Sequence, residues 1–493
     1  MKRVASGILP VITVNRKASK ALHQQIYDAY RAAIVDGRLR PGQRIPSTRV
    51  LASEICVSRF PVLNAYAQLL AEGYLESRVG AGTVIARSLP DQLTASEPAG
   101  SAYAPTPSGP RPVARRCSTL PRDAGSQWLQ RWGAFRVGQV AVDQFPLHVW
   151  SNLVARRCRT MDAHAFHYGD PMGAMAFRET IANYLKTARS LHCEAEQVMI
   201  VGGSQQALEI SARVLVDPGS SVWVEQPGYR LARDVFALTG CHPVAVPVDN
   251  EGLDVAAGIR QCRKARAAFV TPSHQFPLGV TMSASRRLQL VDWAQNSGSW
   301  IIEDDYDSEF RYESLPIASL QGLDSNSRVV YIGTFSKVLF PSLRVGYIVI
   351  PSDLIERFQA IRRVMDLSPP SFYQEVLSDF IREGHFARHI RRMRVHYGEL
   401  RSALVASLGR ELGPLVEVLG DEAGMHVAVT LQNGGRDLEI AERAARLNLS
   451  LWPLSPSYMG EASRQGFILG FGGTRLTEIP NAVHKLRNLL AMK

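Results

Sequence analysis

Residues 329–337 read VVYIGTFSK, an apolar run that ends in hydroxyl-bearing residues and a lysine. The initial VVYI predicts a buried strand, so Thr334, Ser336 and Lys337 fall at or just beyond its carboxyl end. A lysine amine in this position can form a Schiff base with an aldehyde cofactor, and the hydroxyl groups together with the guanidinium of Arg344 suit a phosphate. An isolated Ser-Lys pair is more often found on a solvated surface, so the rest of the chain has to decide between the two interpretations.

Five further apolar runs predict strands on either side of this one. They alternate with helical patterns between about residues 160 and 350, and they read VMIVGG, VWVEQP, AAFVTP, SWIIEDDYD and VGYIVI. Alternating strands and helices favour an α/β fold with a largely parallel sheet covered by helices on both faces. In such sheets ligands bind at the carboxyl ends of the strands, where the polar residues of these runs lie.

A second strand end carries acidic and phenolic side chains. In IIEDDY, residues 301–306, strand alternation places Asp304 and Tyr306 on the same face. A carboxylate can keep a pyridine nitrogen protonated, and a phenol can bind the 3′ oxygen of such a ring. The alternative is an acidic strand end that faces water, which is the better interpretation if this motif stands alone.

Two more motifs add groups that suit a flat, phosphorylated ligand. The strand VMIV is followed by Gly202-Gly203 and a helical pattern, so Ser204 and the amide of Gln205 can hold a phosphate at a helix N-terminus. Tyr229, in the sequence EQPGY, can stack on an aromatic ring or can simply belong to the core. Each motif is weak by itself.

The N-terminal stretch is strongly basic and has the pattern of short helices. Residues 1–87 hold thirteen Lys or Arg and five Asp or Glu, so they carry eight of the eleven net positive charges. A helix is predicted for residues 22–35, with Leu22, Ile26, Tyr30 and Ala33 on its apolar face. Ser47 or Thr48 can cap a second helix that runs to Ile55, and Ser58 can cap a third that runs to about Ala71. A hairpin is predicted around residues 79–82. A basic surface of this kind suits a polyanion, although merely solvated basic surfaces are also common.

The motifs PS-x-R, VSR, AY-x-x-L, AEGYL and G-x-GT, over about residues 20–86, resemble the winged helix-turn-helix domain of the GntR family. The resemblance implies binding to double-stranded promoter DNA, through Arg49, Ser58, Arg59 and Gly82, with Arg44 as a weaker candidate. Cys56 and Pro61 stand where the family usually has Gly and Thr. Proline is tolerated in a first helical turn, so the fold is expected to survive with one backbone contact fewer.

Five motifs of the C-terminal part resemble fold-type I aminotransferases, and their particular residues resemble the MocR/GabR subfamily of GntR regulators. These motifs are SQQAL, EQPGY, TPSHQFP-x-G, IIEDDYDSEFRY and GTFSK. The resemblance covers nearly the whole chain and implies pyridoxal 5′-phosphate as the cofactor. It assigns Lys337 as the Schiff-base lysine, Asp304 as the partner of the pyridinium, Tyr306 as the ligand of the 3′ oxygen and Tyr229 as the stacking residue. Contacts to the phosphate are implied for Ser204, Gln205, Ser336 and Arg344.

The expected organisation is a GntR-type winged helix-turn-helix at residues 15–87, a flexible linker rich in Pro, Ala, Ser and Gly at 88–127, and an aminotransferase-like domain at 128–493. Tyr168 matches a tyrosine that reaches the phosphate of the partner subunit in related enzymes, so the resemblance implies a head-to-tail homodimer. The six cysteines are scattered without metal-ligand spacing, which predicts no metal site and a reduced, cytoplasmic setting. No signal peptide, membrane anchor or membrane-spanning segment is expected.

Three departures concern the expected ligand site. Many aminotransferases have an arginine for the substrate carboxylate where this chain has Ile468, and Arg464 and Arg230 are the alternatives for that role. His274 and Gln275 lie where aminotransferases carry an Asn-Pro-x-Gly ring contact, and no role follows for either. Leu278 stands where the subfamily commonly has Thr. Turnover is therefore less well supported than cofactor binding.

Three functions follow from these expectations. The first is a regulator that senses a small amino-compound effector through its aminotransferase-like domain and controls genes of amino-compound metabolism, rhizopine catabolism being one pathway that such regulators serve. The second is an active pyridoxal-phosphate-dependent aminotransferase with an accessory DNA-binding domain. The third is a DNA-binding protein whose large domain has lost the cofactor and only dimerises, but a scaffold does not need the complete set Lys337, Asp304, Tyr306 and Arg344.

Overall fold

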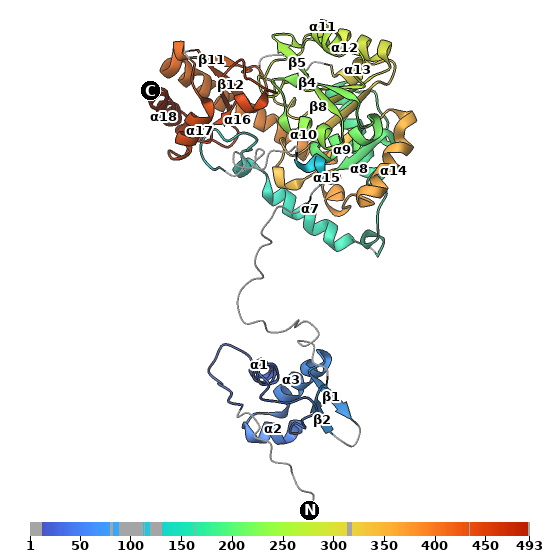
Figure 1. The fold of residues 1–493 in the computed structure, drawn as a ribbon, viewed down its shortest axis with the longest axis vertical. Coiled ribbons are helices and arrows are strands. Elements are labelled where there is room, and N and C mark those ends of the chain that lie inside the picture. Colours follow the sequence, from blue (N-terminus) through green and yellow to red (C-terminus); the bar gives the residue numbers. More distant parts are fainter. Residues whose placement is uncertain are drawn as a thin grey trace, which may run out of the picture. The chain divides into compact units, whose positions relative to one another are not determined.

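The structure is a computed structural model that describes residues 12–78, 82–87, 112, 114–118, 131–161, 163–312, 318–432 and 434–491. The chain divides into two compact units, Met1–Arg111 and Pro112–Lys493 (Figure 1). Each unit has a hydrophobic core of its own. No helix among the described residues is long and apolar enough to cross a membrane.

The described part of the first unit contains three helices and a two-stranded hairpin: α1 Leu22–Val35, α2 Thr48–Glu54, α3 Arg59–Ala71, β1 Leu75–Arg78 and β2 Gly82–Ile85. The predicted apolar face of α1 is confirmed for Ile26, Tyr30 and Ala33, which are buried, whereas Leu22 is only half-buried. The chain leaves α1 through Gly37, whose φ of 71° suits a residue without a Cβ atom.

The hairpin closes the small core of the first unit. Its strands are antiparallel, with Leu75 opposite Ile85, and both of these side chains are buried. The predicted glycine-containing tip, residues 79–81, lies outside the described residues. The order of helix, turn, helix and two-stranded wing is that of a winged helix-turn-helix.

The second unit is built on an eight-stranded mixed sheet in the order β3-β10-β9-β8-β7-β4-β5-β6. The six strands expected from the apolar runs are all present, and the complete set is β3 Val198–Val201, β4 Ser221–Gln226, β5 His242–Asp249, β6 Gly252–Leu253, β7 Ala267–Val270, β8 Trp300–Asp305, β9 Val329–Thr334 and β10 Gly346–Val349. Strands β5, β4, β7, β8 and β9 are parallel, as predicted for most of the sheet.

Strand β10 runs antiparallel to both of its neighbours, β9 and β3. The connection from β9 to β10, residues 335–345, is too short for the crossover that parallel strands require, so the chain has to turn back on itself. This connection carries Ser336, Lys337 and Arg344, and the pairing of β10 with β3 brings it beside Gly203.

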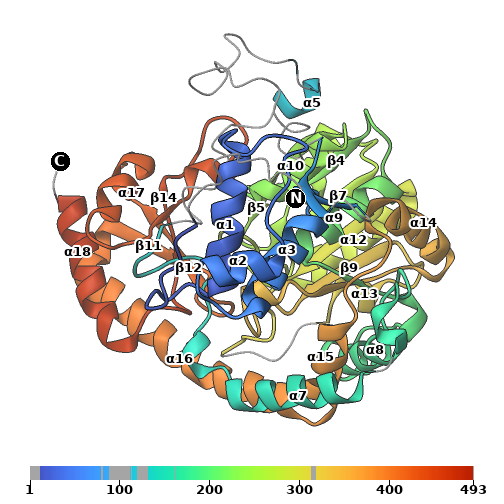
Figure 2. The same ribbon diagram turned by 90° about the horizontal axis from the view of Figure 1, so that it is seen from below.

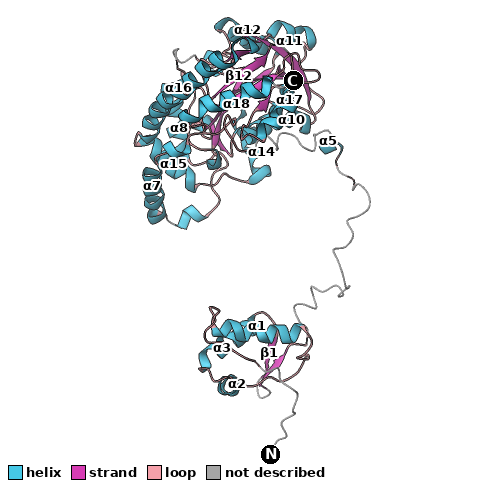
Figure 3. Ribbon diagram, turned by 90° about the vertical axis from the view of Figure 1, so that its left-hand side faces the viewer, coloured by secondary structure: helices cyan, strands magenta, loops and turns pink. Residues whose placement is uncertain are grey.

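Helices cover both faces of this sheet (Figure 3). Strand alternation divides the buried side chains between the two faces. Val222 and Ile302 pack with the helices at residues 204–215, 230–238 and 355–366, whereas Trp223 and Ile301 pack with the helix at residues 284–297 on the other side. The helices among the described residues of the second unit are α5 Arg115–Ser118, α7 Leu147–Thr160, α8 Met175–Arg189, α9 Ser204–Leu215, α10 Arg230–Leu238, α11 Val255–Gln261, α12 Ala284–Ser297, α13 Leu320–Leu323, α14 Ile355–Asp366, α15 Phe372–Arg382, α16 His385–Leu412, α17 Asp437–Ala445 and α18 Ile479–Ala491. Short 3-10 helices are η1 Val142–Gln144, η2 Ala163–Phe166, η3 Ala195–Gln197, η4 Pro341–Leu343, η5 Ser352–Leu354, η6 Gly413–Leu415, η7 Ser455–Ser457 and η8 Leu476–Glu478.

The C-terminal part of the second unit forms a smaller layer of its own. Its antiparallel sheet has the order β11-β12-β14-β13, with bounds β11 Val416–Leu419, β12 His426–Leu431, β13 Trp452–Pro453 and β14 Gly466–Gly470. Figure 2 shows these strands with α17 and α18, orange to red, gathered at one side of the unit. The start of β12 lies beside the loop at residues 274–279, because His426 contacts the carbonyl oxygen of Pro277.

Candidate functional sites

A cavity of about 200 Å³ lies at the carboxyl ends of β8 and β9 and at the start of α9. Segments that are far apart in the sequence supply its lining. Eight of the nine residues predicted to bind a cofactor line it, namely Ser204, Gln205, Tyr229, Asp304, Tyr306, Ser336, Lys337 and Arg344. The short β9–β10 connection and the parallel order of the central strands bring these residues together.

Lys337 projects into this cavity from the turn after β9. Burial lowers the pKa of its amine, while the carboxylates of Asp307 and Asp304 act in the opposite direction. A Cβ atom at Gly138 would lie 2.7 Å from Nζ of Lys337, so a side chain there would force the amine to shift. A desolvated lysine amine is deprotonated more readily, which is the state required for attack on an aldehyde.

Asp304 is a buried residue near the end of β8, and its Oδ1 atom has no hydrogen-bond partner among the described residues. Burial, and next the neighbouring Asp305, raise the pKa of its carboxyl group to about 7. A buried polar atom without a partner is costly. A ring nitrogen that carries a proton would satisfy this oxygen and stabilise the ionised carboxylate.

The opposite end of the cavity suits a phosphate. Helix α9 begins at Ser204, directly after Gly203, and its first amides point out of the helix. The guanidinium of Arg344 lies against Gly203, where a Cβ atom would be 3.2 Å from Nη2. The hydroxyl of Ser336 is buried and has no partner among the described residues. Unpaired donors at a helix N-terminus next to an arginine can hold a phosphate.

Aromatic side chains form the walls between these two ends. The hydroxyl of Tyr229 accepts a hydrogen bond from Nε2 of Gln205 at 3.1 Å, and its ring packs edge-on against Phe276. Tyr306 donates a hydrogen bond to the carbonyl oxygen of His274 at 2.8 Å. Phe276, which the sequence did not single out, therefore shares the cavity with the two predicted tyrosines.

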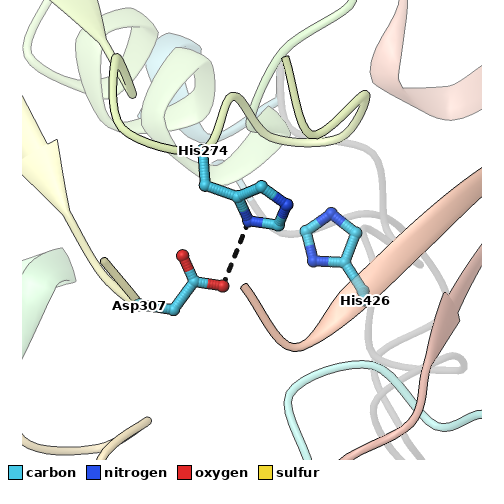
Figure 4. A group of neighbouring side chains, drawn as sticks. All are labelled: His274, Asp307 and His426. Atoms are coloured by element: carbon cyan, nitrogen blue, oxygen red, sulfur yellow. Dashed lines mark hydrogen bonds and ion pairs between the residues drawn. The ribbon is translucent and has the colours of Figure 1, made fainter. Parts of the chain in front are cut away.

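A buried group of His274, Asp307 and His426 lies beside the cavity, and Asp307 and His426 line it (Figure 4). Nδ1 of His274 is 3.2 Å from Oδ2 of Asp307, and Nε2 of His426 is 3.2 Å from the carbonyl oxygen of Pro277. Donor atoms of the three residues lie within 4.8 Å of one another. His274 lies in the loop after β7, Asp307 follows β8 and His426 begins β12, so no sequence spacing could have predicted the group.

The residues considered for a substrate carboxylate do not converge on the cavity. Ile468 is fully buried in an apolar cluster with Phe276, Leu278, Leu454 and Tyr458. Arg230 lies near Asp234, with Nε 3.7 Å from Oδ2, and Arg464 is exposed. Among the described residues, neither arginine lines the cavity. Leu278 is buried in the same cluster, which explains why a polar Thr is not needed here.

Tyr168 is the predicted cofactor residue that does not line the cavity. Its side chain is 85% exposed within the protomer. Gln275 is also outside the lining, because its amide binds Glu225 and the carbonyl oxygens of Pro227 and Phe276. Gln275 therefore supports the loop that holds Phe276 rather than the cavity itself.

The four predicted DNA-binding residues, Arg49, Ser58, Arg59 and Gly82, are all exposed on the first unit. Nε of Arg59 donates to Oγ1 of Thr48 at 3.1 Å, which holds the start of α3 against the start of α2. Ser47 caps α2 by accepting from the amide of Val50, as expected. Ser58 precedes α3, but its hydroxyl makes no capping bond, contrary to the expected side-chain cap.

The two departures in this unit have structural explanations. Cys56 is exposed in the turn between α2 and α3 with a φ of 52°, a conformation that glycine adopts without strain. Pro61 is the third residue of α3, where a helix does not use the amide that proline lacks. Arg44 lies against Gly82 at the base of the wing, 3.1 Å from where a Cβ atom would be.

The comparisons with known proteins agree with this two-part structure. The family described as bacterial regulatory proteins, gntR family, matches residues 22–85, and the family described as aminotransferase class I and II matches residues 135–448. A kynurenine aminotransferase of Pyrococcus horikoshii has a similar structure, with a TM-score of 0.72 and 26% identity, over 77% of this chain and 98% of that chain. Fold and site thus define a winged helix-turn-helix protein with a fold-type I aminotransferase domain.

Two curated relatives extend over almost the whole chain. The probable rhizopine catabolism regulatory protein MocR of Rhizobium meliloti is 37% identical over 97% of this chain and 95% of its own length. The pyridoxine biosynthesis transcriptional regulator PdxR of Corynebacterium glutamicum is 29% identical over 94% of both chains. This chain belongs to the MocR/GabR subfamily of the GntR family of transcription regulators.

Proposed function

We propose that this transcription regulator binds pyridoxal 5′-phosphate in the cavity of its aminotransferase domain and uses it to sense a small amino compound. The observation that carries the proposal is the unpaired Oδ1 of Asp304 in a cavity that also holds Lys337 and the unpaired hydroxyl of Ser336. These three groups are costly to bury without a ligand. A phosphorylated pyridine aldehyde offers each of them a bonding partner.

In this proposal each residue of the cavity has a role that follows from its chemistry. Asp304 holds the proton on the ring nitrogen, Tyr306 binds the 3′ oxygen, and Tyr229 stacks on the ring. Ser204, Gln205, Ser336 and Arg344 bind the phosphate, and Lys337 provides the amine that attaches the cofactor covalently. When bound, pyridoxal phosphate would supply an electrophilic carbon that reacts with primary amines, both that of Lys337 and that of an amino compound.

The DNA-binding side of the proposal rests on the first unit. The recognition helix α3 presents Arg59 and Ser58 at its N-terminus, and Arg49 and Gly82 flank it from α2 and the wing. An effector changes DNA binding only if it has different affinities for two conformations of the protein. We propose genes of amino-compound metabolism as the targets, because the curated relatives are named for rhizopine catabolism and pyridoxine biosynthesis.

The test is the visible absorption spectrum of the purified protein after reconstitution with pyridoxal phosphate, before and after addition of amino compounds. We expect a band of lysine-bound cofactor that borohydride treatment makes permanent. The Lys337→Ala variant should lose this covalent attachment and keep most of its affinity for promoter DNA. An unchanged borohydride-fixed adduct in Lys337→Ala, or a wild-type protein that takes up no cofactor, would contradict the proposal.

A further inference from the structure

The cavity has few positive charges, and the proposed cofactor uses them. Among the described residues that line it, the cationic side chains are Lys337 and Arg344. In the proposed function, Lys337 is bonded to the cofactor and Arg344 to its phosphate. The described residues of this protomer that line the rest of the cavity therefore supply no cation to neutralise an anionic ligand.

One wall of the cavity is apolar. Phe276 lines the cavity and belongs to the buried cluster with Ile468, Leu278, Leu454 and Tyr458. The ring of Trp452 packs edge-on against Phe276 at 6.2 Å between centroids. An ionised carboxylate placed against such a wall would lose its water without gaining a partner, which is strongly unfavourable.

Two polar side chains of the lining, His426 and Asp307, offer hydrogen-bond acceptors. Burial, and next the neighbouring His274, hold the pKa of His426 well below its usual value, so this imidazole is neutral. Its Nε2 donates to the carbonyl oxygen of Pro277 at 3.2 Å, which leaves Nδ1 as an acceptor. Asp307 adds a carboxylate, whose Oδ2 also contacts Nδ1 of His274 (Figure 4). The same oxygen accepts a hydrogen bond from the amide of Met425.

We infer that the effector is a primary amine that carries further hydrogen-bond donors, such as hydroxyl or second amino groups, and no carboxylate. This inference rests on the proposed function, because the primary amine is the group that reacts with the cofactor. The additional donors bind His426 and Asp307, whereas an α-carboxylate meets the negative charge of Asp307 and the apolar wall of Phe276. An amino alcohol, a diamine or an amino sugar has the required chemistry.

The experiment compares amines with their carboxylated counterparts on the reconstituted full-length protein. The pairs are ethanolamine with serine, putrescine with ornithine, and agmatine with arginine, and the readout is the dissociation constant from the change in the cofactor spectrum. We expect the amine without a carboxylate to bind at least about tenfold more tightly within a pair, as one lost charged contact commonly produces. Equal or tighter binding of the amino acids in all three pairs would overturn the inference.

The same spectra distinguish a wrong effector class from a wrong cofactor assignment. A protein that shows the cofactor band but prefers no amine over its amino acid contradicts the effector class alone. A protein that never shows the band contradicts the cofactor itself. Failure of the inference and failure of the proposed function therefore give different spectra.

Variants of His426 test the acceptor directly. His426→Phe should weaken ethanolamine binding about tenfold while the cofactor band persists, and His426→Asn, which keeps an acceptor, should restore part of the affinity. His389→Phe is a matched control, because His389 is also a buried histidine whose Nε2 contacts a backbone carbonyl, that of Val338, but it lies outside the cavity lining. Equal losses in His426→Phe and His389→Phe would assign the effect to stability and overturn the role of His426.

A gain-of-function variant tests the carboxylate exclusion. Ile468→Arg places a guanidinium behind Phe276, and we expect serine to gain affinity relative to ethanolamine. Ile468→Met retains the apolar wall and should keep the preference of the parent protein, which also shows whether the site tolerates substitution. A folded Ile468→Arg protein, verified by circular dichroism, that still prefers ethanolamine by the same factor would contradict the inference.

Discussion

Single polar residues buried in the cavity lower the stability of the protein without a ligand. Asp304 is buried without a partner for Oδ1, and Lys337 is an amine whose pKa is lowered by burial. In a protein folded only for stability, such groups would be paired or replaced by apolar residues. Their presence together is the feature that distinguishes a binding cavity from a packing defect.

The raised pKa of Asp304 predicts how the stability of the cofactor-free protein depends on pH. A carboxyl group whose pKa rises from 3.8 to about 7 on folding favours the folded state while it is protonated, below pH 4. This contribution is lost as the pH rises towards 7, and a shift of this size corresponds to a loss of at most about 4 kcal/mol. Asp304→Asn removes the titration, so its urea-unfolding free energy should fall less between pH 4 and 7 than that of the parent.

Other buried carboxyl groups also have a pKa raised to about 7, namely those of Glu225, Glu303 and Glu309. Because these residues are present in both the parent and Asp304→Asn, the difference between the two pH profiles reports the titration of Asp304. Parallel pH profiles for the parent and Asp304→Asn would show that the carboxyl group is already ionised or solvated. The same variant should also bind pyridoxal phosphate more weakly, since the amide cannot hold the ring nitrogen in its charged form.

At the scale of elements, two serines precede helices in the first unit but differ in what their side chains do. Ser47 accepts a hydrogen bond from the amide of Val50 at the start of α2, whereas Ser58 makes no such bond at the start of α3. Sequence patterns predicted both as caps, because serine is favoured before a helix in either case. An uncapped hydroxyl beside exposed amides is free to contact a phosphate, which agrees with the proposed DNA-binding role of Ser58.

We therefore expect alanine substitutions of the two serines to affect stability and DNA binding differently. Ser47→Ala should lower the unfolding free energy of the first unit by about 1 kcal/mol, measured by circular dichroism on residues 12–111, and should weaken DNA binding only through stability. Ser58→Ala should leave stability nearly unchanged and weaken promoter binding in an electrophoretic mobility assay. A loss of stability in Ser58→Ala as large as that in Ser47→Ala would contradict the assignment.

At the scale of the whole molecule, one protomer does not hold every residue expected around the cofactor. Tyr168 is 85% exposed and does not line the cavity that contains the other eight. Phe166, two residues before Tyr168, is exposed as well. We propose a homodimer in which each protomer provides Tyr168 to the cavity of its partner.

Mixed dimers test this arrangement. Lys337→Ala and Tyr168→Phe should each weaken cofactor binding as homodimers, Tyr168→Phe by about tenfold for a lost phosphate hydrogen bond. A heterodimer of the two variants then has one cavity with Lys337 from one chain and Tyr168 from the other, so one tight site per dimer should return. Titration that shows no restored site in the purified heterodimer would place Tyr168 outside the cavity, or within the same chain.

The sequence alone determined the order of units, six central strands, three N-terminal helices and the residues at the strand ends, because these follow from apolar periodicity, helix signals and contiguous motifs. Only the tertiary structure decided which residues from distant parts of the sequence are in contact, because no contiguous motif contains both partners. The group of His274, Asp307 and His426 joins two sheets, the closed wall around Phe276 depends on Ile468 of β14, and the reversed direction of β10 follows from a short connection. Such contacts depend on how separate elements pack, a property that no local spacing encodes.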